Sequence, residues 1–140
     1  MIKSTYSTTE STHRDIIDFV KAAKSGDSNF KVIDLGGGVN GWTSEIADVI
    51  VDINVNDTQS TLQADICQEK DYAKLISFVE QHGLFDYCIC THTLEDLYNP
   101  FLALNYMPRI AKAGVITMPT MTDELSPVQS LSWSGYIHHR

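Results

Sequence analysis

Acidic residues and glycines stand at spacings that suit a nucleotide-like ligand. Asp34 ends an apolar segment, and three glycines follow it almost at once: Gly36, Gly37 and Gly38. Glycine leaves the backbone bare, so a bulky ligand can lie against it, and it adopts positive φ readily in a tight turn. Asp52 ends a second apolar segment, close to the spacing of about 20 residues at which a carboxylate hydrogen-bonds a ribose in nucleotide-binding folds. Together these features predict a ligand site beside the glycine loop.

The residues around the glycines discriminate between possible ligands. A phosphate-binding loop of the G-x-x-x-x-G-K-[ST] type needs a lysine after its glycines, and none follows here. The spacing Gly36-x-Gly38-x-x-Gly41 does match the dinucleotide pattern formally, so NAD stays open as a ligand. Against NAD, the carboxylate of Asp34 would repel a pyrophosphate, whereas it would attract a ligand with a cationic amino-acid end. The loop therefore favours a cationic ligand.

One histidine stands where a catalytic group is expected. His92 follows the apolar segment 85–90, so it lies at the end of a predicted strand. Imidazole titrates near neutral pH, which makes His92 a candidate to orient or deprotonate a substrate nucleophile, with a purely local hydrogen bond as the alternative. His138 and His139 are adjacent and therefore tend to point apart, so we predict no metal site there.

Hydrophobic periodicity predicts alternating strands and helices around these residues. Near-continuous apolar runs indicate buried parallel strands, and apolar residues at helical spacing indicate amphipathic helices. The expected strands are 30–35, 48–53, 61–64, 85–90 and 115–118. The expected helices are 12–24, a short one at 43–47, 69–82, and one that begins at Pro100 and ends at 112–114.

This alternation predicts one α/β domain over residues 1–140, with the ligand at the carboxyl edge of its sheet. The expected architecture is a Rossmann-like, three-layer α/β/α fold with a mostly parallel sheet of about five strands. We expect residues 1–10 to be loose and residues 120–140 to form a loop or lid over the ligand edge.

Taken in order, these residues resemble the motifs of class I S-adenosylmethionine-dependent methyltransferases. The first motif of that family is an acidic residue followed by alternating glycines, matched by Asp34, Gly36 and Gly38, with Asn40 in place of the third glycine. Asn is one of the non-glycine residues that best tolerate the left-handed conformation, so this departure is mild. The segment Leu94-Glu95-Asp96-Leu97 is similar to the leucine-and-acid segment of small-molecule methyltransferases.

The resemblance implies a role for each matched residue. The methionine portion of S-adenosylmethionine would lie against Asp34 and the loop formed by Gly36, Gly37, Gly38 and Asn40. The ribose hydroxyls would be held by Asp52, one face of the adenine would meet Ile53, and the adenine edge would contact Asp65 and Ile66. The segment that ends in Thr91 and His92 matches the fourth motif of the family.

The expected function is methyl transfer from S-adenosylmethionine to a small-molecule or sugar-like acceptor. The crossovers between the predicted strands are short, and the family usually continues into two further strands after the fifth, which we expect to be missing here. These departures favour an alternative, a non-catalytic module that binds S-adenosylmethionine or S-adenosylhomocysteine or serves as an interaction domain. A small NAD-binding domain is a third hypothesis.

Composition narrows the partners and the compartment. A formal net charge of -8 with only 10 basic residues predicts no nucleic-acid partner, because phosphate backbones are bound by clustered lysine and arginine. No apolar stretch approaches the roughly 18 residues that span a bilayer, and the first residues lack the apolar region of a secretory signal, so we expect a cytoplasmic protein with no membrane partner. The three cysteines lack a C-x-x-C spacing and are expected to be reduced, buried thiols: Cys67, Cys88 and Cys90.

Overall fold

The computed structural model describes residues 9–120 of the chain and the side chains of residues 11–120. Along these residues, strands and helices alternate, as the hydrophobic pattern predicts. The elements are α1 (Thr9–Gly26), β1 (Val32–Leu35), β2 (Val49–Asp52), β3 (Thr61–Gln63), α2 (Glu69–His82), β4 (Phe85–Thr91), the short 3₁₀ helix η1 (Leu94–Asp96), α3 (Pro100–Ile110) and β5 (Ala111–Thr117).

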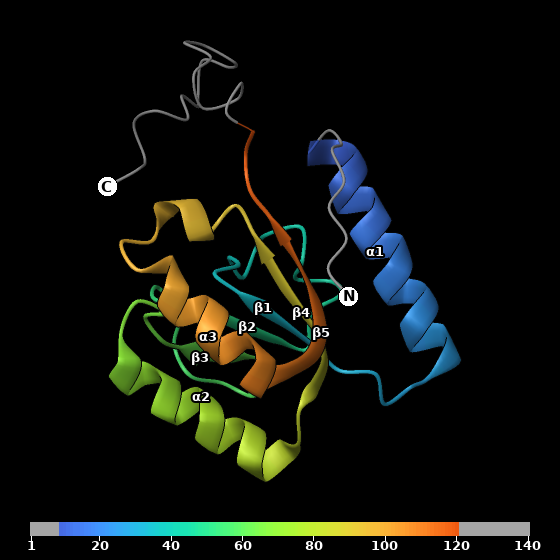
Figure 1. Ribbon diagram of the computed structural model, residues 1–140. Helices are drawn as coiled ribbons and strands as arrows, with labels where there is room; N and C mark the ends of the chain where they lie inside the picture. The colour runs from blue at the N-terminus through green and yellow to red at the C-terminus, as the bar shows by residue number, and fades with distance from the viewer. Residues whose placement is uncertain (1–8, 121–140) are drawn as a thin grey trace.

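The five strands form one sheet in the order β3-β2-β1-β4-β5. Each neighbouring pair is parallel, with Ile33 opposite Val49 on one side of β1 and opposite Cys88 on the other. The chain moves outward from β1 to β3, then returns to the other side of β1 for β4 and β5 (Figure 1). In open α/β sheets, ligands bind outside the carboxyl ends of the strands at such a reversal.

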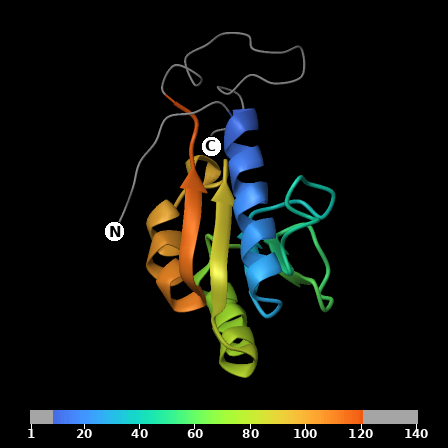
Figure 2. The same cartoon turned by 90° about the vertical axis from the view of Figure 1, so that its right-hand side faces the viewer.

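Helices cover both faces of the sheet, which gives the three layers expected from the sequence (Figures 1 and 2). On one face, Ile16 and Val20 of α1 pack against Val32 and Ile89. On the other face, α2 and α3 enclose the larger core, whose members include Ile33, Leu35, Tyr72, Leu75 and Ile110. Successive side chains of a strand point to opposite faces. Ile33 and Leu35 of β1 therefore face α2 and α3, whereas Val32 and Asp34 face the layer of α1.

One predicted element and one predicted boundary are wrong. The helix expected at 43–47 is a series of turns, closed by hydrogen bonds from the N–H groups of Ile46 and Ala47 to the carbonyl oxygen of Thr43. The connection from β1 to β2 is too short for a packed helix, so the chain crosses in turns. The helix expected to end at 112–114 ends at Ile110, and β5 begins at Ala111 instead of residue 115.

Other boundaries differ less. The possible third strand at 61–64 is confirmed as β3, and the first helix begins at Thr9, so residues 9 and 10 belong to α1 and not to the loose segment expected over 1–10. The rest of that segment and the lid predicted for 120–140, which carries His138 and His139, lie outside the described residues except for residue 120. Over the described part of the chain, no helix is both long enough and apolar enough to cross a membrane.

Candidate functional site

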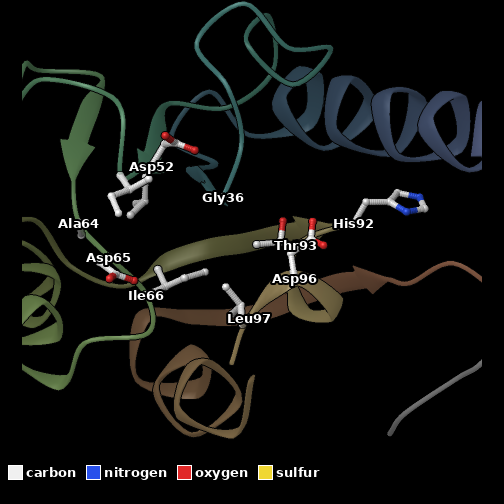
Figure 3. Close-up of a pocket in the computed structure, with 11 residues that line it drawn as sticks. Gly36, Asp52, Ala64, Asp65, Ile66, His92, Thr93, Asp96 and Leu97 are labelled. Carbon is white, nitrogen blue, oxygen red and sulfur yellow. The ribbon is translucent and has the colours of Figure 1, made fainter. Parts of the chain in front are cut away.

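A cavity of about 280 Å³ opens at the carboxyl edge of the sheet (Figure 3). Its walls come from the segments that follow β1, β2, β3 and β4, which meet at this edge because all the strands are parallel. The position is the one that strand order and the glycine loop predict. The lining residues are Gly36, Val51, Asp52, Ile53, Ala64, Asp65, Ile66, His92, Thr93, Asp96 and Leu97.

The glycine loop is shaped by contacts within the protein. Gly36 has φ of 88° and donates its N–H to the carbonyl oxygen of Val51 at 2.8 Å, and a Cβ at this position would overlap the side chain of Thr93. A Cβ at Gly37 would overlap the carboxylate of Asp34. At Gly38 the space that a Cβ would occupy is open. Internal packing therefore requires the first two glycines, and only the third leaves room above the backbone.

Asp34 lies beneath this loop and does not line the cavity. Its side chain is 1% exposed and accepts a hydrogen bond from the hydroxyl of Thr43. Burial raises the pKa of Asp34 to about 6, although the Thr43 hydrogen bond opposes the shift, and the nearby charge of Asp52 adds to it. Asp34 therefore supports the loop by packing against it, and the loop lies between its carboxylate and any ligand in the cavity.

Asp52 and Asp65 stand on the cavity wall, and each is held by backbone N–H groups. Oδ1 of Asp52 accepts the N–H of Asn54 at 2.6 Å, and Oδ1 of Asp65 accepts the N–H of Cys67 at 2.8 Å. The N–H of Asp65 in turn donates to Oδ2 of Asp71 in the first turn of α2, at 2.9 Å. These bonds fix the chain where β2 and β3 end, which sets the positions of both carboxylates.

The segment after β4 forms the opposite wall. His92 has φ of 50°, and its Nδ1 lies 3.4 Å from Oε1 of Glu95 in η1. The hydroxyl of Thr93 donates to the carbonyl oxygen of Thr91 at 3.0 Å, which keeps this turn tight. The hydroxyl of Tyr98 donates to the carbonyl oxygen of Cys67 at 2.9 Å and so ties this wall to the segment after β3.

The structure brings together some of the predicted site residues and separates others. On the cavity wall lie Gly36, Asp52, Ile53, Asp65, Ile66 and His92; away from it lie Asp34, Gly37, Gly38, Asn40 and Thr91. Five lining residues received no site role in the sequence prediction: Val51, Ala64, Thr93, Asp96 and Leu97. The leucine-and-acid pattern at 94–97 was a usable signal for the last two. Nothing in the sequence marks Thr93 as the close neighbour of Gly36.

The cavity is acidic. Three of its lining residues are acidic, Asp52, Asp65 and Asp96, none is lysine or arginine, and most of its surface is apolar. Val51, Ile53 and Ile66 supply apolar surface between these acids. A site of this kind favours a ligand that carries positive charge beside an apolar ring system, because carboxylates in a partly enclosed space attract cations strongly.

The cysteines lie in the core as free thiols, as predicted. Burial raises the pKa of Cys88 well above its ordinary value and that of Cys90 to about 12, so both stay protonated and unreactive at neutral pH. Within residues 9–120, no group of three or more His, Cys, Asp and Glu side chains is arranged to hold a metal ion.

The ligand must therefore be inferred from fold and geometry. Comparison of this chain with known protein families, with curated proteins and with solved structures finds no match.

Proposed function

We propose that this chain is an S-adenosylmethionine-dependent methyltransferase that acts on a small-molecule acceptor, with its cofactor in the cavity at the carboxyl edge of the sheet. The observation that carries the proposal is the acidic cavity without lysine or arginine on its wall. S-adenosylmethionine has a sulfonium and an ammonium group against a single carboxylate, so it is a net cation with an apolar adenine. The order of the sequence motifs supports the same ligand.

The alternative ligand NAD fits these residues less well. A pyrophosphate is usually bound at the N-terminus of a helix that directly follows the glycine loop. Here turns follow the loop, over residues 42–46, and no helix lies between the loop and β2. The carboxylates of Asp52, Asp65 and Asp96 would also repel the two phosphates, and the lining residues offer no cation to offset them.

The proposed roles of the residues follow from their positions. When bound, S-adenosylmethionine supplies a methyl group that the sulfonium already makes electrophilic. The protein therefore has to align donor and acceptor and exclude water, which alone accounts for a large part of the rate in such transfers. Asp52 is placed to bind the ribose hydroxyls, Asp65 and Ile66 to meet the adenine, and the loop at Gly36 to support the methionine portion.

Calorimetry tests the cofactor directly. We expect S-adenosylmethionine and S-adenosylhomocysteine to bind with one site per chain, and NADH not to bind. Replacement of Asp52 by Asn removes a charge from the wall and should weaken S-adenosylmethionine binding by about tenfold, the effect of roughly 1.4 kcal/mol. Asp48→Asn, at the opposite edge of the sheet, is the matched control and should leave binding unchanged. Failure of both adenosyl compounds to bind the wild-type chain would overturn the proposal.

A second candidate function, binding without turnover, is favoured by one observation. The turns in place of the first crossover helix deprive the loop of the helix N-terminus, and with it of several N–H groups aimed at a ligand. A methyl-release assay separates the two functions, because a binding module retains affinity for S-adenosylmethionine but transfers its methyl group to no member of an acceptor panel.

A further inference from the structure

Two imidazole rings lie against each other beside the cavity. His13 of α1 stacks on Trp42 with ring centroids 4.1 Å apart, and it meets His92 edge to face with centroids 6.4 Å apart. Figure 3 shows His92 extending from the cavity wall towards the side of α1. Behind His92, Oε1 of Glu95 lies 3.4 Å from Nδ1. We call His13, His92 and Glu95 the imidazole cluster.

Hydrogen bonding around the cluster is incomplete at two atoms. Among the described residues, two buried polar atoms near it have no hydrogen-bond partner: Nε2 of His13 and Oγ1 of Thr117. Thr117 is adjacent because its carbonyl oxygen accepts the N–H of His92 at 3.0 Å. His92 also has φ of 50°, which residues other than glycine adopt rarely. Unsatisfied buried polar atoms and uncommon backbone conformations both concentrate at functional sites.

The three members of the cluster are not equivalent in charge. Burial lowers the pKa of His13, and the charge of His92 lowers it further. Glu95 has only 10% of its side chain exposed, so its carboxylate acts on His92 through little solvent. Of the two imidazoles, His92 is the one shown with a carboxylate beside it, that of Glu95.

We propose that the imidazole cluster is the acceptor subsite of this cavity and that it takes a neutral hydroxyl compound whose proton passes to Nε2 of His92. This inference rests on the proposed function. In the step, the acceptor oxygen forms a bond to the methyl carbon while the carbon–sulfur bond breaks, with its electron pair going to sulfur. The hydroxyl proton moves to Nε2 of His92, and Glu95 stabilises the imidazolium through Nδ1. His13 is a positioning residue that holds the His92 ring from the α1 side.

The class of acceptor follows from charge and from the base. A carboxylate or phosphate acceptor would enter a cavity lined by Asp52, Asp65 and Asp96 with no lysine or arginine, and it would be repelled. A hydroxyl group is a poor nucleophile until its proton is removed. A neutral imidazole hydrogen-bonded to a carboxylate can remove that proton as a general base. A neutral hydroxyl compound fits both features of the site: the acidic lining does not repel it, and the imidazole can remove its proton.

Binding of small probes tests the acceptor class. The chain, saturated with S-adenosylhomocysteine and labelled with ¹³Cε1-histidine, is titrated with phenol, methyl glucoside, anisole and phenyl phosphate. We expect phenol or methyl glucoside to shift the signals of His13 and His92 while that of His82, at the other end of the sheet, stays still. Anisole, which has no hydroxyl, and phenyl phosphate, which is anionic, should produce no such shift. Shifts caused equally by anisole or phenyl phosphate, or no shift with either hydroxyl probe, would overturn the inference.

Variants test the roles within the cluster. Formation of the methyl ether of the responding probe should fall about a hundredfold in His92→Gln, the usual size of a general-base contribution, and less in Glu95→Gln and His13→Gln. Glu95→Asp should recover part of the Glu95→Gln loss, and all of these variants should bind S-adenosylmethionine within about threefold of wild type, a difference under 1 kcal/mol. His82→Gln is the matched control, since His82 lies at the end of α2, where its Nδ1 is 2.9 Å from the carbonyl oxygen of Phe78 and its ring stacks on that of Phe78.

The outcomes separate this inference from the function on which it rests. If S-adenosylmethionine does not bind the wild-type chain, the proposed function fails, and the acceptor subsite fails with it. S-adenosylmethionine can also bind while His92→Gln forms the methyl ether as fast as wild type and as the control His82→Gln. In that case the imidazole cluster is not the acceptor subsite, and the cofactor proposal stands.

Discussion

The two edges of the sheet carry similar acidic residues in opposite surroundings. At the amino edge, Asp48 pairs with Lys24 at 2.9 Å and Asp86 pairs with Lys112 at 2.6 Å. Each also accepts a backbone N–H, from Val32 and Lys31 respectively. At the carboxyl edge, the cavity wall holds Asp52, Asp65 and Asp96 without any lysine or arginine, and Asp34 lies buried just beneath.

The fold therefore separates acidic residues that contribute to stability from acidic residues that can bind a ligand. At the amino edge, each acidic side chain is paired with a lysine and also accepts a backbone N–H, so its charge is balanced within the protein. Acids at the carboxyl edge leave a negative field in a partly enclosed space, and a cationic ligand is the partner that such a field selects. Burial of a carboxylate costs stability because it disfavours the charged form, and the raised pKa of Asp34 reports that cost. The comparison can be tested by substitution at each edge.

The largest effect is expected at Gly37. In Gly37→Ala the new methyl group would overlap the carboxylate of Asp34, which is buried and bonded to Thr43 and so cannot move away. We expect a loss of roughly 3 kcal/mol in the free energy of unfolding, as for other overpacked sites. Urea unfolding measures it. Gly38→Ala is the matched control, because its methyl group meets open space, and an equal loss in both variants would contradict the packing role of Gly37.

Asp34→Asn should stabilise the protein. The pKa of Asp34 is raised from 3.8 to about 6, so the folded state holds its proton more tightly than the unfolded state. Stability is therefore lost as pH rises between these two values, by up to roughly 3 kcal/mol. Asparagine removes this loss and keeps an oxygen for the hydroxyl of Thr43. We expect the variant to exceed wild type in unfolding free energy at pH 8, with the gap closing towards pH 4; a variant less stable than wild type at pH 8 would contradict the assignment.

Thr43→Val should have a smaller effect of the opposite sign. It removes the hydroxyl that donates to Asp34 and leaves a buried carboxylate with less hydrogen bonding. The expected loss is about 2 kcal/mol at pH 8, the usual range for a buried group deprived of its partner. Thermal unfolding of Thr43→Val, Asp34→Asn and the double variant gives the coupling between them. If the loss in Thr43→Val is the same with Asn at position 34 as with Asp, the charge of Asp34 is not what the hydroxyl stabilises.

Much of the fold and of the cavity was predictable from local patterns. The apolar runs of β1, β2 and β4 marked buried parallel strands, and Tyr72, Leu75 and Val79 at helical spacing marked the buried face of α2. Because parallel strands bring their carboxyl ends together, residues that follow different strands, such as Asp52, Asp65 and His92, could be placed at one edge. Strand periodicity alone also implies that Asp34 shares a face with Val32, away from the larger core.

What could not be predicted depends on contacts between distant residues. β5 begins earlier than its apolar pattern because residues 112–114 are exposed at the sheet edge and are held by pairing with β4, which starts with Phe85 opposite Ala111. Turns at 42–46 replace the expected helix because the connection from β1 to β2 is too short for a helix that packs on the sheet, whatever the helix propensity of its residues. The requirement for glycine at position 36 comes from Thr93, and the imidazole cluster joins α1 to the segment after β4. Neither contact has a local sequence signal.

The smallest effect is expected at Asp86, at the amino edge of the sheet. Replacement of Asp by Asn should stabilise the protein at position 34 but destabilise it at position 86. The hydrogen bond from Lys112, with a second from the N–H of Lys31, holds the pKa of Asp86 below its ordinary value. Its contribution to stability is therefore present at neutral pH and is lost as pH falls through the folded-state pKa, below 3.8. Asp86→Asn should lower the unfolding free energy at pH 7 by about 0.5–1 kcal/mol, since the pair is partly exposed to solvent.

The loss should shrink in 1 M NaCl, where the Debye length is roughly 3 Å, whereas the gain in the buried Asp34→Asn should persist. Chemical unfolding of both variants at low and high salt therefore tests the contrast between the edges, and the same sign of change in both would show that the two edges do not differ in how they treat a carboxylate.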